Sequence, residues 1–249
     1  MLLNAETHKW ESDYWHPAVT VDAVVFGYDE DEHGLSVLLI ERGLEPFKGS
    51  WALPGGFITQ NDESAEAAVY RELHEETDVE GIYLKEFNTF SKVGRDPRPN
   101  ERVITIAFLA LVVKKDYQIK GGDDAKQAQW FPLHDLPQLA FDHQEIVAAA
   151  FERLQQIIHF EPIAFHLLNK DAFTMPQLHS IYKAILAPRE EESNPVNDRR
   201  NFMKKMLALK YVRKTGEIVR GTPSRPPELY RFDEEAYWSA KKKGKRLEF

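Results

Sequence analysis

Three glutamates define one face of a helix predicted over residues 61–77. Glu72, Glu75 and Glu76 stand at positions i, i+3 and i+4, so their carboxylates share one side of a helix. Because neighbouring carboxylates repel one another, such a cluster favours a hard cation, which prefers oxygen ligands. A Pro-Gly-Gly bend at residues 54–56 lets the backbone approach the same place. A solvated acidic helix face is the alternative that these residues alone leave open.

The residues around the glutamates make the pattern more specific. Arg71 lies one turn before Glu75 and can orient it through a forked hydrogen bond. The segment from Gly56 through Glu63 to Arg71 and the glutamates resembles the Nudix box, G-x5-E-x7-R-E-U-x-E-E-x-G-U, where U is a large apolar residue. Six residues rather than five separate Gly56 from Glu63, and Asp78 stands at the second glycine. Asp tolerates the left-handed conformation that ends a helix, so we expect the helix to form.

The resemblance implies both a fold and a chemistry. The fold is α/β: a Nudix α/β/α sandwich with a mixed sheet. The implied chemistry is attack of water on a nucleoside diphosphate linked to a second group, assisted by Mg²⁺ or Mn²⁺. The catalytic set would be Glu72, Glu75 and Glu76 as metal ligands, with Glu63 and Arg71 pairing to brace the helix. Asp123 and Asp124 are candidate bases outside the box, and a solvated turn is the alternative for them.

Residues outside the box also resemble one branch of the family. Residues 53–58 (LPGGFI), 95–98 (RDPR) and 140–143 (AFDH) are similar to ADP-ribose pyrophosphatases and to Nudix-related transcriptional regulators. The substrate-binding residues expected from this are Gly55, Gly56, Arg95 and Arg98, because a guanidinium matches the geometry of phosphate. Pairing with neighbouring acids is the alternative for the two arginines. We expect Asp142 to cap a following helix and His143 to have a structural role.

The charge of the chain is unevenly distributed. Residues 1–150 hold 13 Lys and Arg against 27 Asp and Glu, a net charge of −14. Residues 196–249 hold 15 basic against 7 acidic residues, a net charge of +8. This asymmetry indicates two domains with different partners, because acidic groups hold metal ions and basic groups hold phosphate backbone.

The basic part has the pattern of a DNA-binding module. A helix predicted over 198–209 carries Phe202, Met203, Met206, Leu207 and Leu209 on one face and cations on the other. Two strands follow around a basic loop, and the order of helix, helix and basic hairpin resembles an α+β winged-helix domain. An ordinary surface helix is the alternative. The residues expected to contact DNA are Arg200, Asn201, Lys204, Lys205, Arg213, Lys214, Arg220 and Arg225.

The predicted organisation is therefore a Nudix domain (1–141), a bridging helix (142–160), a winged-helix domain (161–235) and a basic tail (236–249), in which we expect residues 241–246 to be disordered. The chain has no cysteine, which suits a reducing cytoplasm, and its longest apolar stretch, 103–113, is too short to span a membrane. Two hypotheses follow. One is a regulator that senses an ADP-ribose-like or sugar metabolite and binds duplex DNA as a homodimer. The other is an ADP-ribose pyrophosphatase, and a regulator could also retain that activity.

Overall fold

The computed structural model describes residues 2–3, 10–11, 14–119, 125–187, 194–219 and 226–244. Four residues with predicted roles, Asp123, Asp124, Arg220 and Arg225, lie outside the described residues. Within those ranges, no helix is both long and apolar enough to cross a membrane.

The first domain is built on a mixed sheet of seven strands. Its main path runs β5-β4-β3-β8-β7, and β6 pairs with β3 while β9 pairs with β4. The central strands β3 (Ala18–Asp29) and β8 (Val103–Val113) run parallel, and the other pairings are antiparallel. The remaining strands are β4 (Gly34–Arg42), β5 (Trp51–Ala52), β6 (Gly55–Phe57), β7 (Lys85–Phe90) and β9 (Ala125–Pro132). A two-stranded sheet of β1 (Leu2–Leu3) and β2 (Trp10–Glu11) precedes them.

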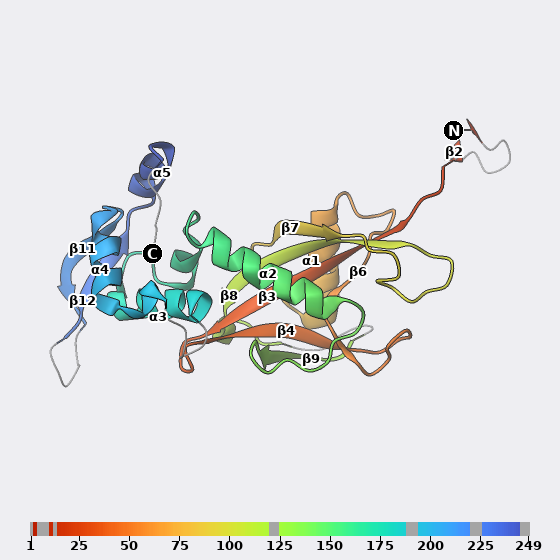
Figure 1. The fold of residues 1–249 in the computed structure, drawn as a ribbon, viewed down its shortest axis with the longest axis horizontal. Coiled ribbons are helices and arrows are strands. Elements are labelled where there is room, and N and C mark those ends of the chain that lie inside the picture. Colours follow the sequence, from red (N-terminus) through yellow and green to blue (C-terminus); the bar gives the residue numbers. More distant parts are fainter. Residues whose placement is uncertain are drawn as a thin grey trace.

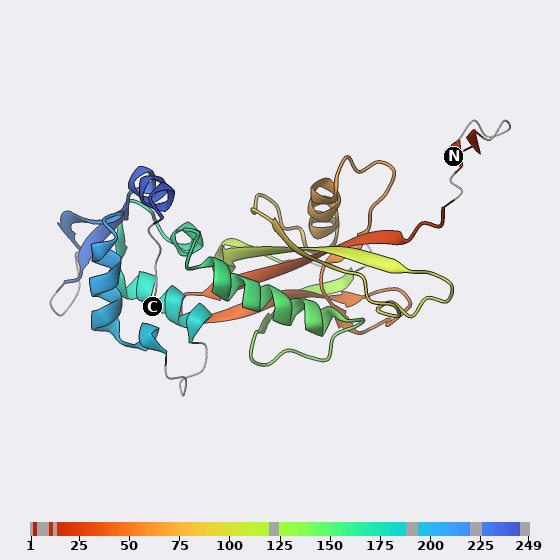
Figure 2. The same cartoon turned by 45° about the horizontal axis from the view of Figure 1, so that its top comes forward.

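One helix covers each face of the large sheet, as Figures 1 and 2 show. Side chains of β3 alternate between the two faces, which is the period of a strand. Val21, Ala23 and Val25 pack under α1 (Ala65–Thr77), whereas Val24 and Phe26 belong to the core under α2 (His143–Ile157). The predicted α/β/α sandwich with a mixed sheet is confirmed. Helix α2, predicted as a bridge, forms the second helical layer of this sandwich.

The limits of α1 differ from the prediction at one end. The expected helix began at Asn61, but α1 begins after Ser64, whose side chain accepts a hydrogen bond from the Ala67 amide. Residues 59–62 form their own turn instead, because Asp62 accepts hydrogen bonds from the amide and hydroxyl of Thr59. At the other end Asp78 adopts the left-handed conformation, with φ of 59°, as predicted.

The second domain is a winged helix. Its three-stranded sheet has the order β10-β12-β11, and helices α3 (Met175–Leu186) and α4 (Arg199–Ala208) pack beside it. The strands are β10 (Phe173–Thr174), β11 (Val212–Ile218) and β12 (Glu228–Phe232), and short 3-10 turns lie at Lys114–Asp116, Ile163–Leu167 and Pro195–Asn197. Thr174 and Gln177 form a capping box at the start of α3.

The predicted disorder of residues 241–246 is wrong for Lys241 and Lys242, which belong to a helix, while Lys245 and Arg246 lie outside the described residues. Residues 234–242 form helix α5, capped by Asp233, whose side chain accepts a hydrogen bond from the Ala236 amide. Tyr237 on this helix packs against Phe232 and Tyr211 of the winged helix. The polar composition of the segment hid this single anchoring aromatic residue.

The two domains share one continuous apolar core. The cluster under α2 extends into the winged helix, where it includes Leu178 and Ile181 of α3. Polar contacts cross the junction too: Gln155 of α2 donates to the carbonyl of Ile185 at 2.9 Å. Helices α2 and α3 therefore connect the sandwich to the winged helix through packed side chains.

Candidate functional site

A cavity of about 340 Å³ lies beside α1, at one end of strands β3 and β4. Its walls come from β3, the end of β4, the Gly-Gly bend, α1, residues 95–98 and residues 141–143. All three box glutamates line it, together with Gly55, Gly56, Arg95 and Arg98. The structure thus brings the predicted metal and substrate residues to one place.

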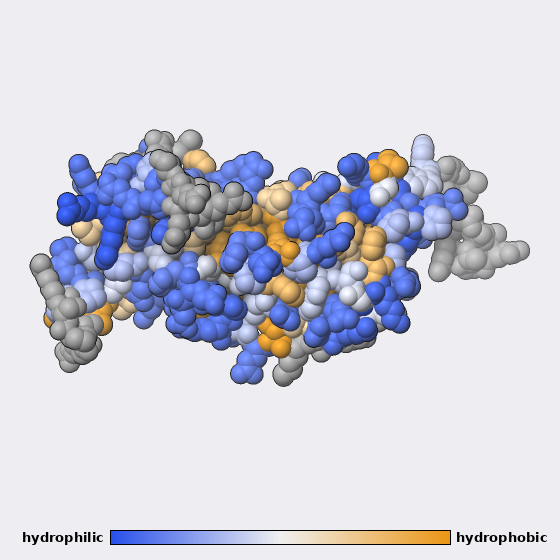
Figure 3. Space-filling model, turned by 60° about the horizontal axis from the view of Figure 1, so that its bottom comes forward, coloured by the Kyte–Doolittle hydropathy of each residue, from blue (hydrophilic) through white to orange (hydrophobic). Residues whose placement is uncertain are grey.

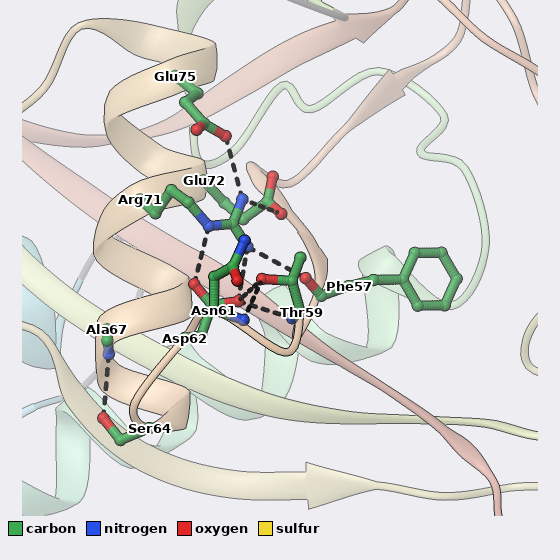
Figure 4. A network of polar contacts seen from close by, with 9 residues as sticks. All are labelled: Phe57, Thr59, Asn61, Asp62, Ser64, Ala67, Arg71, Glu72 and Glu75. Carbon is green, nitrogen blue, oxygen red and sulfur yellow. Dashed lines mark hydrogen bonds and ion pairs between the residues drawn. The ribbon is translucent and has the colours of Figure 1, made fainter. Parts of the chain in front are cut away.

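Arg71 is the centre of the polar network at this cavity (Figure 4). Its Nε and Nη2 donate to the two carboxylate oxygens of Asp62, both at 2.9 Å. Its Nη1 donates to Glu72 at 2.8 Å and to Glu75 at 3.0 Å. A further bond from Nη2 reaches the carbonyl of Phe57. Arg71 therefore fixes the loop before α1 to the helix and orients two of the three glutamates.

The prediction that Glu63 braces Arg71 is wrong, because Asp62 occupies that position. The turn at 59–62 places the Asp62 carboxylate against the guanidinium, while Glu63 is exposed. The Arg71 guanidinium holds the pKa of Asp62 well below its usual range. Five residues separate Gly56 from Asp62, as in the Nudix box. The extra residue of this chain therefore lies between Asp62 and Arg71.

The two glycines of the bend allow the carboxylates to approach the backbone. The Gly55 amide donates to Glu76 at 2.8 Å, and a Cβ on Gly55 would lie 2.1 Å from the carbonyl oxygen of Val21. A Cβ on Gly56 would lie 2.4 Å from Glu72 Oε1. Burial raises the pKa of Glu76 to about 8 and also raises the pKa of Glu72. The cavity thus holds carboxylates whose negative charge is poorly compensated.

These carboxylates are suited to a divalent cation, although they do not converge as they stand. In the described part of the chain, no three His, Cys, Asp or Glu side chains are grouped as metal ligands. The reason is that Arg71 holds Glu72 and Glu75, while the Gly55 amide holds Glu76. The donors are nevertheless all oxygens, they face one cavity, and a cation would relieve their uncompensated charge. The residues present therefore fit a hard divalent metal.

Arg95 lies buried between two aspartates at the floor of the cavity. It donates to Asp142 at 2.9 and 2.7 Å, and Asp22 lies 3.6 Å away. Arg95 therefore pairs with neighbouring acids, which was the alternative to phosphate binding, and this pairing lies inside the protein and not on its surface. Asp142 occupies the N-cap position of α2 without the predicted side-chain cap, because its carboxylate is taken by Arg95. Contact of Arg95 with a phosphate stays a prediction.

His143 is a structural residue in this arrangement, as expected. It is buried, and its Nδ1 accepts a hydrogen bond from the Leu53 amide at 2.9 Å. Burial lowers the pKa of its imidazole. The ring is therefore neutral and fixes the strand before the Gly-Gly bend to the start of α2.

Two cation–aromatic pairs line the cavity. The guanidinium of Arg98 lies 4.9 Å from the centre of the Phe57 ring, and it also pairs with Asp96 at 3.0 Å. Arg42 lies 4.8 Å from the centre of the Phe141 ring. The sequence analysis missed Arg42 as a site residue, because only the fold brings the end of β4 beside residue 141. An arginine ending an otherwise apolar strand was the one available signal.

Helix α4 presents cations on its outer face. Phe202 and Met206 are buried against the winged-helix core, where Phe202 packs on Tyr182 of α3. Arg200 and Lys204 are exposed, and Asn201 and Lys205 are half-buried. Arg199, which the sequence analysis did not single out, is exposed beside them. Met203 is also exposed, so its predicted place on the core face is wrong.

The two predicted DNA contacts on β11 already have acidic partners. Arg213 pairs with Asp233 at 2.9 Å, and Lys214 pairs with Glu228 at 2.6 Å. Both side chains are about half exposed. They stand on the hairpin beside α4, but a phosphate would have to compete with these carboxylates.

The sandwich, its glutamate-bearing helix and the following winged helix define the class. The chain belongs to the Nudix family: residues 16–150 match the NUDIX domain, and residues 164–232 match the NrtR DNA-binding winged helix domain. Nudix hydrolases generally use divalent metal ions, consistent with the oxygen donors of the cavity.

Particular proteins resemble the whole chain or its first domain. The chain is 32% identical to the ADPR responsive transcriptional repressor NtrR of Acinetobacter baylyi, over 89% of this chain and 84% of that protein. It is 43% identical to an ADP-ribose pyrophosphatase of Methanocaldococcus jannaschii, over 54% of this chain and 73% of that protein.

Solved structures agree with these sequence matches. Shewanella oneidensis NrtR complexed with a 27mer DNA superposes with a TM-score of 0.66 at 29% identity, covering 92% of this chain and 97% of that one. The NUDIX domain of the same NrtR complexed with ADP ribose gives a TM-score of 0.50 at 37% identity, covering 57% of this chain and 90% of that one.

Proposed function

We propose that this protein is a transcriptional regulator whose Nudix domain binds ADP-ribose and whose winged helix binds duplex DNA. The observation that carries the proposal is the pairing of both domains in one chain, matched together over most of its length by an ADPR responsive repressor. The cavity supplies suitable chemistry for the effector. Its carboxylates favour a divalent metal that can accompany a diphosphate, and Arg98 lies at its wall.

The DNA interface would be the outer face of α4 with the adjoining hairpin. Arg200 and Lys204 are exposed there, so they can reach phosphates without disturbing the core. Asn201 is a candidate for reading an adenine edge, as an amide can. The net charge of −14 on residues 1–150 would repel DNA, so contact is confined to the basic part of the chain.

The test is a DNA-binding titration with and without ADP-ribose. We expect the best binding sequence to be selected from a random duplex library by the intact protein. Saturating ADP-ribose should then change the Kd for that duplex by at least about fivefold, the lower range of allosteric coupling. AMP at the same concentration serves as the control. Selection of no sequence would contradict the DNA role, whereas an unchanged Kd would contradict only the effector role.

Hydrolysis of ADP-ribose is a second candidate function of the same cavity. The observation in favour is that Arg71 and all three glutamates are retained and ordered by one network. Glu72, Glu75 and Glu76 would hold Mg²⁺ or Mn²⁺, and a bound metal neutralises phosphate charge and acidifies its coordinated water. The residues of the chain would orient the diphosphate and accept a proton from the attacking water.

Incubation with ADP-ribose and Mg²⁺ tests this second function. We expect AMP and ribose 5-phosphate to appear, and Glu72→Gln to remove most of the rate. Glu66→Gln, at an exposed position on the same helix, is the matched control. No AMP above background with either metal would leave the cavity as an effector site only.

Two further properties belong to the proposal. A single winged helix covers few base pairs, so we propose a homodimer that binds two half-sites about one helical turn apart. We also propose a cytoplasmic location, which suits a DNA-binding protein without cysteine. Light scattering of the free and DNA-bound protein measures the first property.

A further inference from the structure

A second and larger cavity lies at the junction of the two domains. Its volume is about 670 Å³, and no residue that lines it also lines the cavity beside α1. The Nudix domain supplies the β3–β4 turn, residues 133–136 after β9, and one side of α2, while the winged helix supplies α3. Figure 3 looks onto this side of the molecule and shows apolar side chains gathered midway along its length.

The interior of this junction cavity is apolar. Leu35 and Val147 are buried there, Phe151 is half-buried, and Ala184 closes the α3 side. Small-molecule sites in proteins have volumes of about 300–1,000 Å³ and are lined mostly by apolar side chains. The junction cavity therefore has the size and lining of a ligand site rather than of a packing defect, which rarely exceeds the volume of a few methyl groups.

The polar groups of the cavity stand at its rim, and one of them is the ammonium group of a lysine. Lys183 of α3 and two imidazoles, His33 and His134, stand around the opening, and all three are exposed. Glu32 is the one carboxylate among the described lining residues, and it is also exposed. An anionic group placed near Lys183 could use this cation while an attached apolar body enters the cavity.

We propose that the junction cavity binds a small amphipathic monoanion, with an apolar body and a single carboxylate or sulfonate group. Such a ligand would contact α2 and α3 together. A polar contact already joins the two domains near this cavity, since Tyr28 at the end of β3 hydrogen-bonds Ser180 of α3. The site lies between the sensing and DNA-binding domains, so its occupant would restrain their relative orientation. This proposal does not depend on ADP-ribose or on hydrolysis.

Anilinonaphthalene sulfonate is a suitable probe, because it combines an aromatic body with one sulfonate and fluoresces in apolar surroundings. We expect one molecule to bind each intact chain with saturable fluorescence. Octanoate should displace it, whereas octanol, which has the same chain length without the charge, should displace it much less. Saturating ADP-ribose should leave the bound probe in place.

Two variants with matched controls locate the site. Ala148 is exposed on the α2 wall, so Ala148→Trp should fill the cavity and weaken probe binding at least about tenfold, with Ala172→Trp, at an exposed turn, as its control. Lys183→Gln should weaken binding about three- to fivefold, the range of an exposed ion pair, with Lys242→Gln on α5 as its control.

Several results would overturn the proposal. Unchanged binding in both Ala148→Trp and Lys183→Gln would place the probe elsewhere. Equal displacement by octanoate and octanol would remove the requirement for an anion. If Ala148→Trp instead converts a dimer into a monomer, measured by light scattering, the cavity is covered by a second copy of the chain and is no ligand site.

Discussion

Arg95 and Asp142 form a two-point ion pair, with Nε to Oδ2 at 2.9 Å and Nη2 to Oδ1 at 2.7 Å. Both side chains are almost completely buried. The pair joins a wall of the glutamate cavity to the residue that precedes α2, and α2 continues to the winged helix. The ion pair therefore links the glutamate cavity to the helix that connects the two domains.

Removal of Asp142 should destabilise the protein. In Asp142→Ala the buried Arg95 guanidinium loses its two-point partner and keeps only the more distant Asp22, at 3.6 Å. Breaking a buried ion pair in this way costs about 3 kcal/mol. Urea unfolding followed by tryptophan fluorescence measures this destabilisation. Asp135→Ala, at an exposed position, should stay within about 0.5 kcal/mol of the parent. Equal midpoints for the two variants would show that the pair contributes nothing to stability.

The correction from Glu63 to Asp62 gives the next prediction. Asp62→Asn should lower the melting temperature and reduce any hydrolase rate, because Arg71 would lose its two-point ion pair with the loop before α1 and keep only the helix partners Glu72 and Glu75. Glu63→Gln is the matched control one residue away and should resemble the parent in both measurements. The reverse order of effects would restore Glu63 as the bracing acid.

The loss of stability in Asp62→Asn should depend on pH in a direction that the pKa of Asp62 determines. The pKa of Asp62 is depressed in the folded protein, so its contribution to stability is present above its ordinary pKa of about 3.8 and disappears as the pH falls below that value. The difference between the parent and Asp62→Asn should thus be constant near neutral pH and shrink in acid.

The sequence predicted the local features of this protein well and its long-range contacts poorly. The spacing of Glu72, Glu75 and Glu76 and the alternation of β3 depend only on the periods of helix and strand. The Arg95–Asp142 pair joins residues 47 positions apart, and no local pattern encodes it. From sequence spacing alone, Asp62 and Glu63 match the acidic position of the Nudix box about equally well. Only the turn at Thr59, which directs one of them inward, decides between them.

Helix α4 illustrates a second limit. Because a 10-residue helix has few turns, its hydrophobic face is defined by few residues. Hydropathy alone therefore does not decide whether Met203 lies on the core face or on the outer face. Packing settles the matter, since Phe202 and Met206 fill the available core and leave Met203 exposed. Similarly, α5 was missed because its core contacts come from Tyr237 and two alanines, Ala236 and Ala240, within a mostly charged segment.

Glu76 should make the metal-free protein less stable as the pH rises. Its folded pKa is raised from 4.5 to about 8, so the associated stability is fully present below about pH 4.5 and is lost as the pH increases through 8. The variant Glu76→Gln tests this expectation, because its side-chain amide oxygen can still accept a hydrogen bond from the Gly55 amide but carries no charge. At pH 9 in EDTA the variant should be about 5 kcal/mol more stable than the parent, since one pKa unit corresponds to about 1.4 kcal/mol. Near pH 4.5 the two should be equal, and Mg²⁺ at pH 9 should stabilise the parent more than the variant. Parallel stability curves across this range would contradict a buried, metal-responsive Glu76.

Binding of duplex DNA should depend on the outer face of α4. Changing Arg200 and Lys204 together to Ala should weaken binding and reduce the slope of log Kd against log salt by about two, roughly one unit for each phosphate group that is no longer neutralised. The fold should survive because both side chains are exposed and the buried Phe202 and Met206 are untouched. A control that removes two exposed lysines of the acidic domain, Lys48 and Lys126, should leave the slope unchanged. If the α4 variant binds its selected duplex with the parent's affinity and salt slope, this helix does not face DNA.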